Sequence, residues 1–380
     1  MWTRRALLAA SAAATGWPGL SFAAVGPDAR LVLVLLRGGL DGLDAVVPYG
    51  DPRYTEVRGA RALDRPGLGS GVLDLDGTFG LHPAFAPLMP MWAAGELAAV
   101  HAVATPYRER SHFDAQDILE NGTPSAGGAD TGWLNRALLT VAGPPSLAVG
   151  RNIPLVLRGP SAATSADLTR PPVPEDAWLD RVADLLHPDP QLARAFADAL
   201  ATQEMLTSAG PSATSRGLPA RFRAAGSLLA ADEGPRVAVI DTSGWDTHAQ
   251  QEGALRRNLD DLAVGLVDLA SAMGPTWKRT VVLVTSEFGR TASANGTGGT
   301  DHGTGGLLLL AGGAVSGGKV YGDWPGLGRL HDGRDVLPTT DVRSWFGGVL
   351  CAHLGVADRA LGDIFPGDLR GVFTDVIRAA

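Results

Sequence analysis

Residues 281–290 read VVLVTSEFGR, and this stretch decides the fold class. An uninterrupted run of β-branched and aliphatic residues predicts a strand that is buried on both faces, as strands of parallel sheets are. The run ends in the carboxylate of Glu287, and the pair Asp301-His302 arrives one loop later. Because ligands bind at the carboxyl ends of strands in α/β proteins, the stretch predicts a functional site at this strand end.

Two earlier apolar runs end in residues of the same chemistry. One leads into the glycine-rich loop of Asp41, and the other leads into Asp246 and His248. Strands that alternate with helices predict a parallel sheet with crossover helices on both faces. We therefore expect an α/β fold with a mainly parallel central sheet. The expected strands are 31–36, 97–103, 153–157, 236–241, 280–286 and 306–311, and the expected helices are 82–94, 113–121, 191–207, 250–273 and 341–354, the last capped by Asp341.

The N-terminus predicts an export signal. Arg4 and Arg5 precede a short alanine-rich apolar stretch, and residues 21–23 resemble a small-residue cleavage site. Paired arginines are typical of the twin-arginine pathway, which exports folded proteins; a general secretory signal that carries two arginines is the alternative. We expect residues 1–23 to be removed and residues 24–380 to form one domain, with an insert around 122–230, in the periplasm or secreted from a bacterium.

Composition excludes several classes of function. The net charge of −8, without a basic run, is unlike that of a nucleic-acid-binding protein. Lys278 and Lys319 are the only lysines, and neither is followed by Ser or Thr, so the sequence has no Gly-x-x-x-x-Gly-Lys-Ser/Thr phosphate loop. No stretch after the leader approaches the ~20 apolar residues of a membrane span. The single cysteine, Cys351, can form neither an internal disulfide nor a thiolate metal cluster.

Carboxylates and imidazoles gather at the predicted strand ends. Taken singly, each has an ordinary structural explanation: a turn for Asp41, an ion pair with Arg290 for Glu287, and a surface loop for the later Asp-His pair. Taken together, they supply the oxygen and nitrogen ligands of a divalent metal. The candidate metal ligands are Asp41, Asp246, His248, Glu287, Asp301 and His302.

Residues 107–113 read YRERSHF, follow a predicted strand and open a helix. Ser111 at the helix start either caps the helix or presents its hydroxyl beside free N–H groups, where phosphate or sulfate binds. Neighbouring arginines favour an anion at this place. No Gly-x-Ser-x-Gly nucleophile elbow surrounds this serine. The candidate catalytic residues are Ser111, His112 and Arg110, with His112 a metal ligand or an acid–base group, and the candidate substrate-binding residues are Arg37, Arg108 and Arg290.

The order of these motifs resembles the alkaline phosphatase and sulfatase superfamily. More closely, the chain resembles the bacterial family named domain of unknown function 1501. Six motifs carry this resemblance: LRGGLDGL at 36–43, RSHF at 110–113, GWDTH at 244–248, SEFGR at 286–290, GTDHG at 299–303 and YGDWPG at 321–326. The superfamily resemblance implies a strand-end Asp as metal ligand, a Ser at a helix start as nucleophile, and later Asp and His residues that hold metal.

The resemblance implies an exported, metal-dependent hydrolase of phosphate or sulfate esters that acts on a small anionic ester or glycan. Phosphatases place an Asp-His pair where this chain has Glu287-Phe288, so one histidine ligand is missing. The resemblance is therefore compatible with Zn²⁺, Ca²⁺, Mg²⁺ or Mn²⁺ as the metal, bound at one site or at two. A non-catalytic cell-envelope protein that binds an anionic glycan or a partner on the same fold is the alternative.

Overall fold

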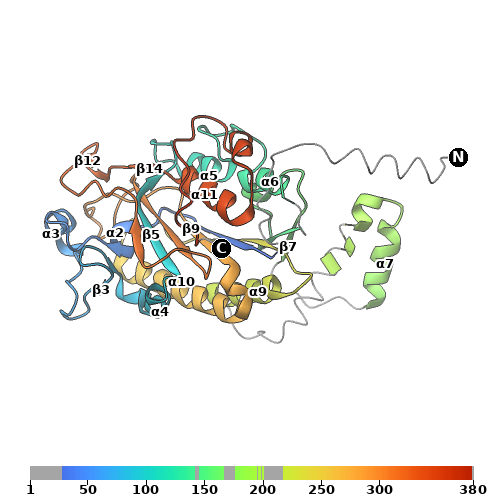
Figure 1. Cartoon of the computed structure of the whole chain (residues 1–380), viewed down its shortest axis with the longest axis horizontal. Coiled ribbons are helices and arrows are strands. Elements are labelled where there is room, and N and C mark those ends of the chain that lie inside the picture. The colour runs from blue at the N-terminus through green and yellow to red at the C-terminus, as the bar shows by residue number, and fades with distance from the viewer. Residues whose placement is uncertain are drawn as a thin grey trace, which may run out of the picture.

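The computed structural model describes residues 28–141, 145–166, 176–194, 196–197, 199–200 and 217–378. The predicted leader at 1–23 lies outside these residues, as does the end of the predicted helix 191–207. Figure 1 shows a central sheet between two layers of helices.

The central sheet runs in the order β11-β5-β10-β9-β1-β8-β6-β7, with β14 paired to β5. Within the described chain, β10 alone runs antiparallel to its neighbours in this sheet, β9 and β5. The predicted α/β fold with a mainly parallel sheet is confirmed. The strands are β1 (Arg30–Leu36), β5 (Leu97–Ala104), β6 (Ser146–Val149), β7 (Ala163–Ala166), β8 (Val237–Thr242), β9 (Thr280–Thr285), β10 (Gly306–Ala311), β11 (Lys319–Tyr321) and β14 (Thr340–Asp341).

Side chains of β1 alternate between two apolar cores, one on each face of the sheet. Val32 and Val34 belong to the core that α4 (Met89–Ala93), α9 (Leu218–Ala230) and α10 (Gln251–Met273) cover. Leu31 and Leu33 belong to the opposite core. Burial on both faces explains why this strand reads as an uninterrupted apolar run. The helices over the second core are α5 (His112–Asn121), α6 (Trp133–Leu138), α11 (Val342–Leu354) and α12 (Leu361–Ile364). Figure 1 shows α5, α6 and α11 above the sheet.

Smaller elements surround the sheet. The helices are α2 (Gly42–Ala45), α3 (Tyr54–Arg58) and α7 (Asp176–Leu186). Two small sheets contain β2 (Val46–Val47), β3 (Leu73–Asp74) and β4 (Gly80–Leu81), and β12 (Leu330–His331) and β13 (Asp335–Val336). The 3-10 helices are η1 (Gly59–Arg61), η2 (Pro83–Leu88), η3 (Leu155–Leu157), η4 (Gly274–Arg279) and η5 (Asp358–Ala360).

Two predicted elements differ from the structure. The predicted strand 153–157 is wrong, because Leu155–Leu157 form the 3-10 helix η3, with Pro154 as the residue before it. A short apolar run cannot be told from a buried helical turn by its pattern. The predicted helix 82–94 divides into η2 and α4, which contain Pro87 and Pro90. Proline removes a backbone donor and disrupts a continuous helix.

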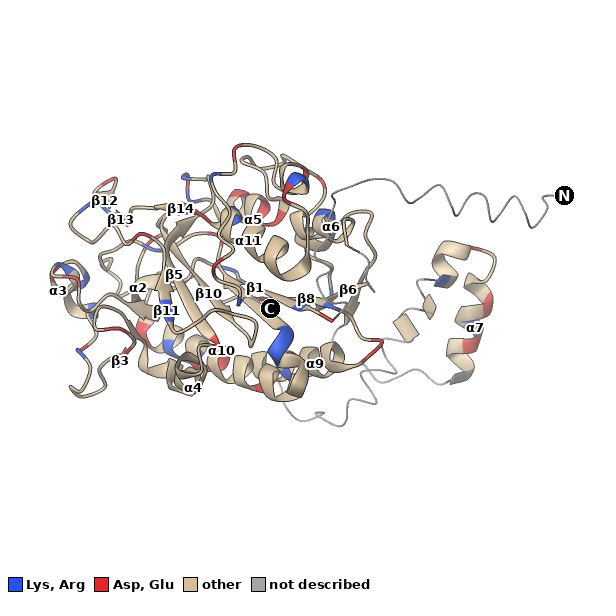
Figure 2. Ribbon diagram, viewed as in Figure 1, with Lys and Arg blue, Asp and Glu red and all other residues tan. Residues whose placement is uncertain are grey.

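The segment 122–230 contributes to the central sheet, because β6 and β7 extend it beyond β8. Acidic and basic residues are interspersed over the ribbon in Figure 2. Among the residues that the structure describes, no helix has the length and apolar character of a membrane span.

Candidate metal centre

The site lies at the carboxyl edge of the sheet. Strands β1, β8 and β9 are parallel, and β5 shares their direction because β10 runs antiparallel to both β9 and β5. The loops that follow these strands therefore meet at one edge. His112 begins α5 after β5, Asp246 and His248 follow β8, and His302 lies between β9 and β10.

Four of the candidate residues form one group, which we call the histidine–aspartate cluster: His112, Asp246, His248 and His302. One ligand atom from each of His112, Asp246 and His302 lies within 4.8 Å of the others. His302 Nε2 lies 3.2 Å from Asp246 Oδ1, and His112 Nε2 lies 3.4 Å from Asp246 Oδ2. His248 Nε2 joins them, 2.8 Å from His302 Nε2 and 3.0 Å from Asp246 Oδ1.

The other nitrogen of each imidazole is held by an oxygen atom. Nδ1 of His112 lies 2.7 Å from Glu287 Oε1, and Nδ1 of His248 lies 3.2 Å from Asp301 Oδ1. Nδ1 of His302 lies 3.0 Å from the carbonyl oxygen of Arg110. A carbonyl and an ionised carboxylate only accept hydrogen bonds, so each Nδ1 carries the proton. Each neutral imidazole then points the lone pair of Nε2 into the cluster, as metal-binding histidines do.

The cluster fits a divalent metal ion. Among the described residues, His112 Nε2 is buried without a hydrogen-bond partner. The Nε2 atoms of His248 and His302 face each other at 2.8 Å, and two lone pairs at this distance repel unless a cation or proton lies between them. Imidazole nitrogens outnumber carboxylates in this donor set, which favours zinc or another borderline ion over Ca²⁺ or Mg²⁺.

Glu287 supports His112 and is itself fully hydrogen bonded. The side chain is buried, and Oε1 accepts from Gly38 N at 2.8 Å, from Gln116 Nε2 at 2.9 Å and from His112 Nδ1. Burial opposes ionisation of Glu287, but the hydrogen bonds from His112 and Gln116 outweigh it and lower the pKa of the carboxyl group. The sequence predicted a direct metal ligand here, and the structure places Glu287 behind His112, hydrogen bonded to its Nδ1.

Asp301 occupies the corresponding position behind His248. Its Oδ1 accepts from Asn295 Nδ2 at 3.0 Å as well as from His248 Nδ1. The hydrogen bond from Asn295, the largest effect, lowers the pKa of Asp301 and keeps it ionised. The structure therefore places this predicted ligand beside the cluster, where it orients an imidazole.

Asp41 lies in a separate buried ion pair. Oδ1 accepts from the backbone N–H groups of Leu43 and Asp44 and so caps α2. Oδ2 accepts from Arg58 Nη2 at 2.8 Å and from Gln251 Nε2 at 2.6 Å. The structure does not bring this predicted metal ligand to the histidine–aspartate cluster, because its oxygens serve helix capping and a buried guanidinium.

Arg290 positions Asp246 and is not open to a substrate. Its guanidinium is fully buried and donates to Asp246 Oδ1 at 2.7 Å. The remaining donors bind the backbone carbonyls of Gly38, Gly39, Trp245 and Thr300. Burial works against ionisation of Asp246, but the charge of Arg290 outweighs it and lowers the pKa of Asp246. The predicted substrate-binding role of Arg290 is thus replaced by loop anchoring.

Gly38 allows the first loop to approach the loop of Asp246. Its φ of +128° lies in the region that favours glycine. A Cβ atom at this position would lie 2.3 Å from the backbone nitrogen of Asp246. Backbone contact this close excludes any side chain, so Gly38 fixes the position of Asp246 relative to β1.

The other predicted arginines differ in their partners. Arg37 donates to Asp241 Oδ2 at 3.1 Å and to Glu120 Oε1 at 2.8 Å. Arg110 donates to Asp335 Oδ2 at 2.9 Å and pairs with Asp332. Arg108 instead binds the backbone carbonyls of Thr105 and Tyr107 through Nη1. Arg37 and Arg110 therefore have carboxylate partners.

Ser111 is the residue before α5, next to His112. It occupies the N-cap position, but its side chain makes no capping hydrogen bond. The side chain is half-buried, and the backbone nitrogen of Ser111 donates to Tyr107 Oη at 3.3 Å. The hydroxyl therefore lies at the positive end of α5 without a structural role in capping it.

Three residues of the site were missed from the sequence. Gln116 donates to Glu287, and it lies four residues after His112, a spacing that puts both on one helix face. Phe288 packs its ring against His112 and His302, at centroid distances of 4.8 Å and 5.0 Å. Asn295 holds Asp301. The helical spacing of Gln116 could have indicated its position, whereas Asn295 carries no comparable signal.

The protonation equilibria of the imidazoles differ. The hydrogen bond to Glu287 raises the pKa of His112 against the effect of burial. Burial, together with the charge of His112, lowers the pKa of His302. His302 is therefore neutral over a wider pH range than His112.

Solved structures resemble the chain weakly. Ps i-CgsB in complex with k-i-k-neocarrahexaose has a TM-score of 0.36 and 9% identity over 91% of this chain and 75% of that one. TAB5 alkaline phosphatase, a His135Glu mutant with bound Mg, has a TM-score of 0.34 and 11% identity over 74% and 90% of the two chains.

The C-terminal periplasmic domain of EcEptC from Escherichia coli, in complex with Zn, has a TM-score of 0.33 and 11% identity over 76% of this chain and 74% of that domain. Similarity at this level carries no information about a reaction. No curated protein matches the sequence. Residues 78–344 match a family model, and the chain belongs to the protein family of unknown function DUF1501.

Proposed function

We propose that this protein is an exported, metal-dependent hydrolase of phosphate or sulfate esters. The observation that carries the proposal is the convergence of three imidazole Nε2 atoms and the Asp246 carboxylate beside the uncapped N-terminus of α5. The hydroxyl of Ser111 lies at that N-terminus. Metal ligands, a hydroxyl nucleophile and free N–H groups are the components that ester hydrolysis at phosphorus or sulfur requires.

The residues of the histidine–aspartate cluster would hold the metal. Glu287, Asp301 and the carbonyl of Arg110 fix the tautomers and orientations of the three imidazoles. A bound divalent metal supplies a Lewis acid that polarises an ester oxygen and lowers the pKa of a nearby hydroxyl. Zinc suits a set of three nitrogens and one carboxylate.

Ser111 would act as the nucleophile. The backbone N–H groups in the first turn of α5 have no partners within the helix, and they carry the positive end of its dipole. They favour binding of the anionic oxygens of a phosphate or sulfate ester next to the hydroxyl. His112 follows Ser111 directly, so the rigid start of the helix holds the nucleophile and a ligand at a fixed spacing.

The test combines metal analysis with turnover. The purified protein is analysed by plasma mass spectrometry and assayed on nitrophenyl phosphate, bis-nitrophenyl phosphate and nitrophenyl sulfate. We expect stoichiometric metal and turnover of at least one ester, loss of metal and turnover in His302→Ala, and loss of turnover with retained metal in Ser111→Ala. Ser125→Ala, at an exposed serine, is the matched control.

The outcomes separate the alternatives. Turnover by Ser111→Ala at the normal rate would refute the nucleophile assignment. Stoichiometric metal without turnover on any ester would favour the non-catalytic envelope protein. Metal-free protein of unchanged stability would reject the hydrolase.

Export is tested with the leader. The proposal expects full-length protein to reach the periplasm of a bacterial host and to remain inside the cell when Arg4 and Arg5 are both replaced by lysine. Export of the double lysine variant at the normal level would refute use of the twin-arginine pathway and favour the general secretory route.

A further inference from the structure

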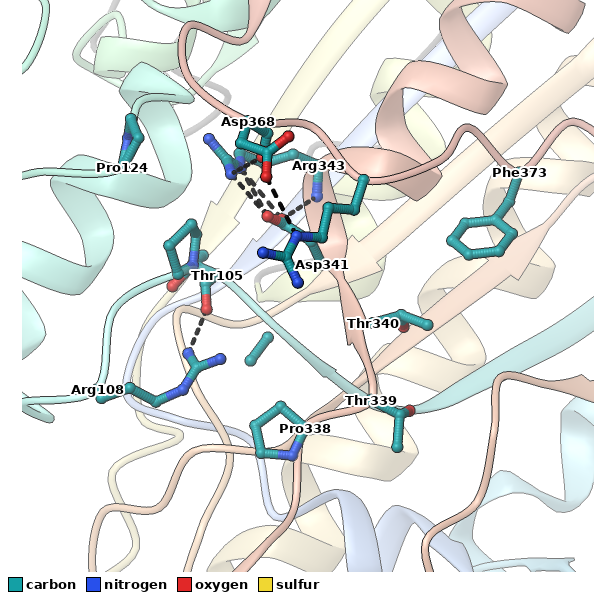
Figure 3. A pocket seen from close by; sticks show the side chains of 13 residues that line it. Thr105, Arg108, Pro124, Pro338, Thr339, Thr340, Asp341, Arg343, Asp368 and Phe373 are labelled. Carbon is teal, nitrogen blue, oxygen red and sulfur yellow. Dashed lines mark hydrogen bonds and ion pairs between the residues drawn. The ribbon is translucent and has the colours of Figure 1, made fainter.

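A hollow lies at the carboxyl end of β5, lined by residues that are not part of the histidine–aspartate cluster. The cavity measures about 450 Å³, within the range of small-molecule sites. Residues from the loop after β5, from β14, from the start of α11 and from the C-terminal segment line it. Figure 3 shows Arg108 on one side of this pocket and the pair Asp341–Arg343 on another.

The charged groups of the lining are paired, with one exception. Arg343 Nη2 donates to Asp341 Oδ2 at 2.7 Å, and Arg370 Nε donates to Asp368 Oδ2 at 3.2 Å. Arg108 is the third arginine of the lining, and within the described part of the chain it has no carboxylate partner. With three arginines and two aspartates, the lining carries one positive charge in excess.

The guanidinium of Arg108 is held through one of its three nitrogen atoms. Nη1 donates to the carbonyl oxygens of Thr105 and Tyr107, a contact that Figure 3 marks for Thr105. These bonds hold the guanidinium at the cavity and leave Nε and Nη2 as donors. Burial lowers the pKa of Arg108; the nearby charge of Asp341 opposes this shift in part, and the charge of Arg110 adds to it. An anion that accepts hydrogen bonds from Arg108 in the cavity would offset the remaining cost of burying its charge.

The remaining walls suit a hydroxylated ring. Thr105, Thr339 and Thr340 contribute polar surface, and Pro338 and Phe373 contribute apolar surface. Phe373 is held rigidly because its ring stacks on Trp345 at a centroid distance of 4.0 Å. Rigid apolar walls with a few fixed polar groups are typical of pockets for small organic ligands.

We propose that this cavity binds a sugar-sized organic anion, whose carboxylate, sulfate or phosphate group accepts hydrogen bonds from Arg108. The site is separate from the metal centre and does not depend on the proposed ester hydrolysis. The loop from Thr105 to Ser111 connects the two, since it supplies Arg108 to the cavity and the Arg110 carbonyl to His302.

The experiment is calorimetric titration of the folded protein with glucuronate, glucose 6-phosphate, glucose 6-sulfate and uncharged glucose. We expect one molecule of at least one sugar anion to bind, at least tenfold more tightly than glucose. Arg108→Gln should weaken binding by about tenfold or more, since a charge-assisted hydrogen bond is lost. Arg257→Gln, at an exposed arginine of α10, is the control for the loss of one charge.

Two further variants make the result decisive. His302→Ala should bind the sugar anion normally, which separates this site from the metal centre. Arg108→Lys keeps the charge but loses the planar fork, and we expect intermediate affinity. Folding of each variant is checked by circular dichroism. The proposal is overturned by equal affinity for glucose and the anions, by absence of binding, or by normal binding to folded Arg108→Gln.

Discussion

Replacing Glu287 by glutamine distinguishes a metal ligand from a residue that orients one. The glutamine carbonyl can keep the place of Oε1, which accepts hydrogen bonds from His112, Gln116 and Gly38. Its amide group would meet Ser286 Oγ, which lies 2.8 Å from Oε2 in the structure. The substitution thus removes the negative charge behind His112 while it preserves most of the hydrogen bonds.

The structure sets the expected size of the effect. Loss of a carboxylate that orients a ligand weakens metal binding by about 10- to 100-fold. Glu287→Gln should weaken metal binding by about tenfold, or about 1.4 kcal/mol of binding free energy, because His112 keeps an acceptor for Nδ1. Glu287→Ala removes this acceptor as well and should weaken metal binding by about 100-fold, or about 2.7 kcal/mol. His302→Ala removes a proposed direct ligand and should weaken metal binding more than either Glu287 variant.

The assay is competition for Zn²⁺ between the protein and a chromogenic chelator of known affinity. Asp301→Asn is the matched control, since Asp301 stands behind His248 as Glu287 stands behind His112. The reasoning is refuted if Glu287→Gln releases the metal as completely as His302→Ala, which would make Glu287 a ligand. It is equally refuted if both Glu287 variants bind zinc as tightly as the native protein.

Three further predictions concern stability and the loops. Asp41→Asn should lower the free energy of unfolding by about 3 kcal/mol in urea titrations, because it leaves Arg58 buried with one carboxylate partner fewer; loss of bound metal from this variant would instead make Asp41 a ligand. Gly38→Ala should lower the free energy of unfolding by about 1–3 kcal/mol in the same titrations and weaken metal binding, because its Cβ would displace the backbone of Asp246. An unchanged free energy of unfolding together with unchanged metal affinity would contradict the close approach of the two loops. Glu287 has a folded-state pKa below its ordinary value of 4.5, so its contribution to stability is present above pH 4.5 and is lost as the pH falls through the lower folded pKa. Acid titration of the metal-free protein should show this loss, and Glu287→Gln should reduce it; identical acid profiles for both proteins would contradict it.

The apolar runs predicted the central strands well, for a physical reason. β9 and β10 are buried on both faces; β10 and the four positions between Thr280 and Thr285 of β9 are apolar throughout, so the limits of these strands in the sequence are sharp. β6 and β7 were missed because each is four residues long and their sequences, SLAV and ATSA, are not continuous apolar runs. Short strands at the edge of a sheet leave little pattern in the sequence.

The sequence predicts Asp246, His248, Glu287, Asp301 and His302 as one set of metal ligands. In the structure Asp246, His248 and His302 lie together, while Glu287 and Asp301 accept hydrogen bonds from the Nδ1 atoms of His112 and His248. Sequence cannot separate these roles, because a carboxylate that binds metal and one that accepts from Nδ1 follow the same kinds of strand. The choice depends on which oxygen atoms are already occupied, and for Glu287 that is decided by Gly38 and Gln116 from other loops.

The loop before α5 joins the components of the site most closely. Arg110 has a positive φ of 64°, a strained conformation for a residue with a side chain. Its side chain is held by Asp335, and its carbonyl accepts from His302. Strain of about 1–3 kcal/mol persists only where surrounding contacts impose it, and such positions concentrate at functional sites. Ser111 and His112 follow directly. One strained residue therefore holds the imidazole of His302 through its carbonyl and also sets the start of the helix that carries the proposed nucleophile and a proposed metal ligand.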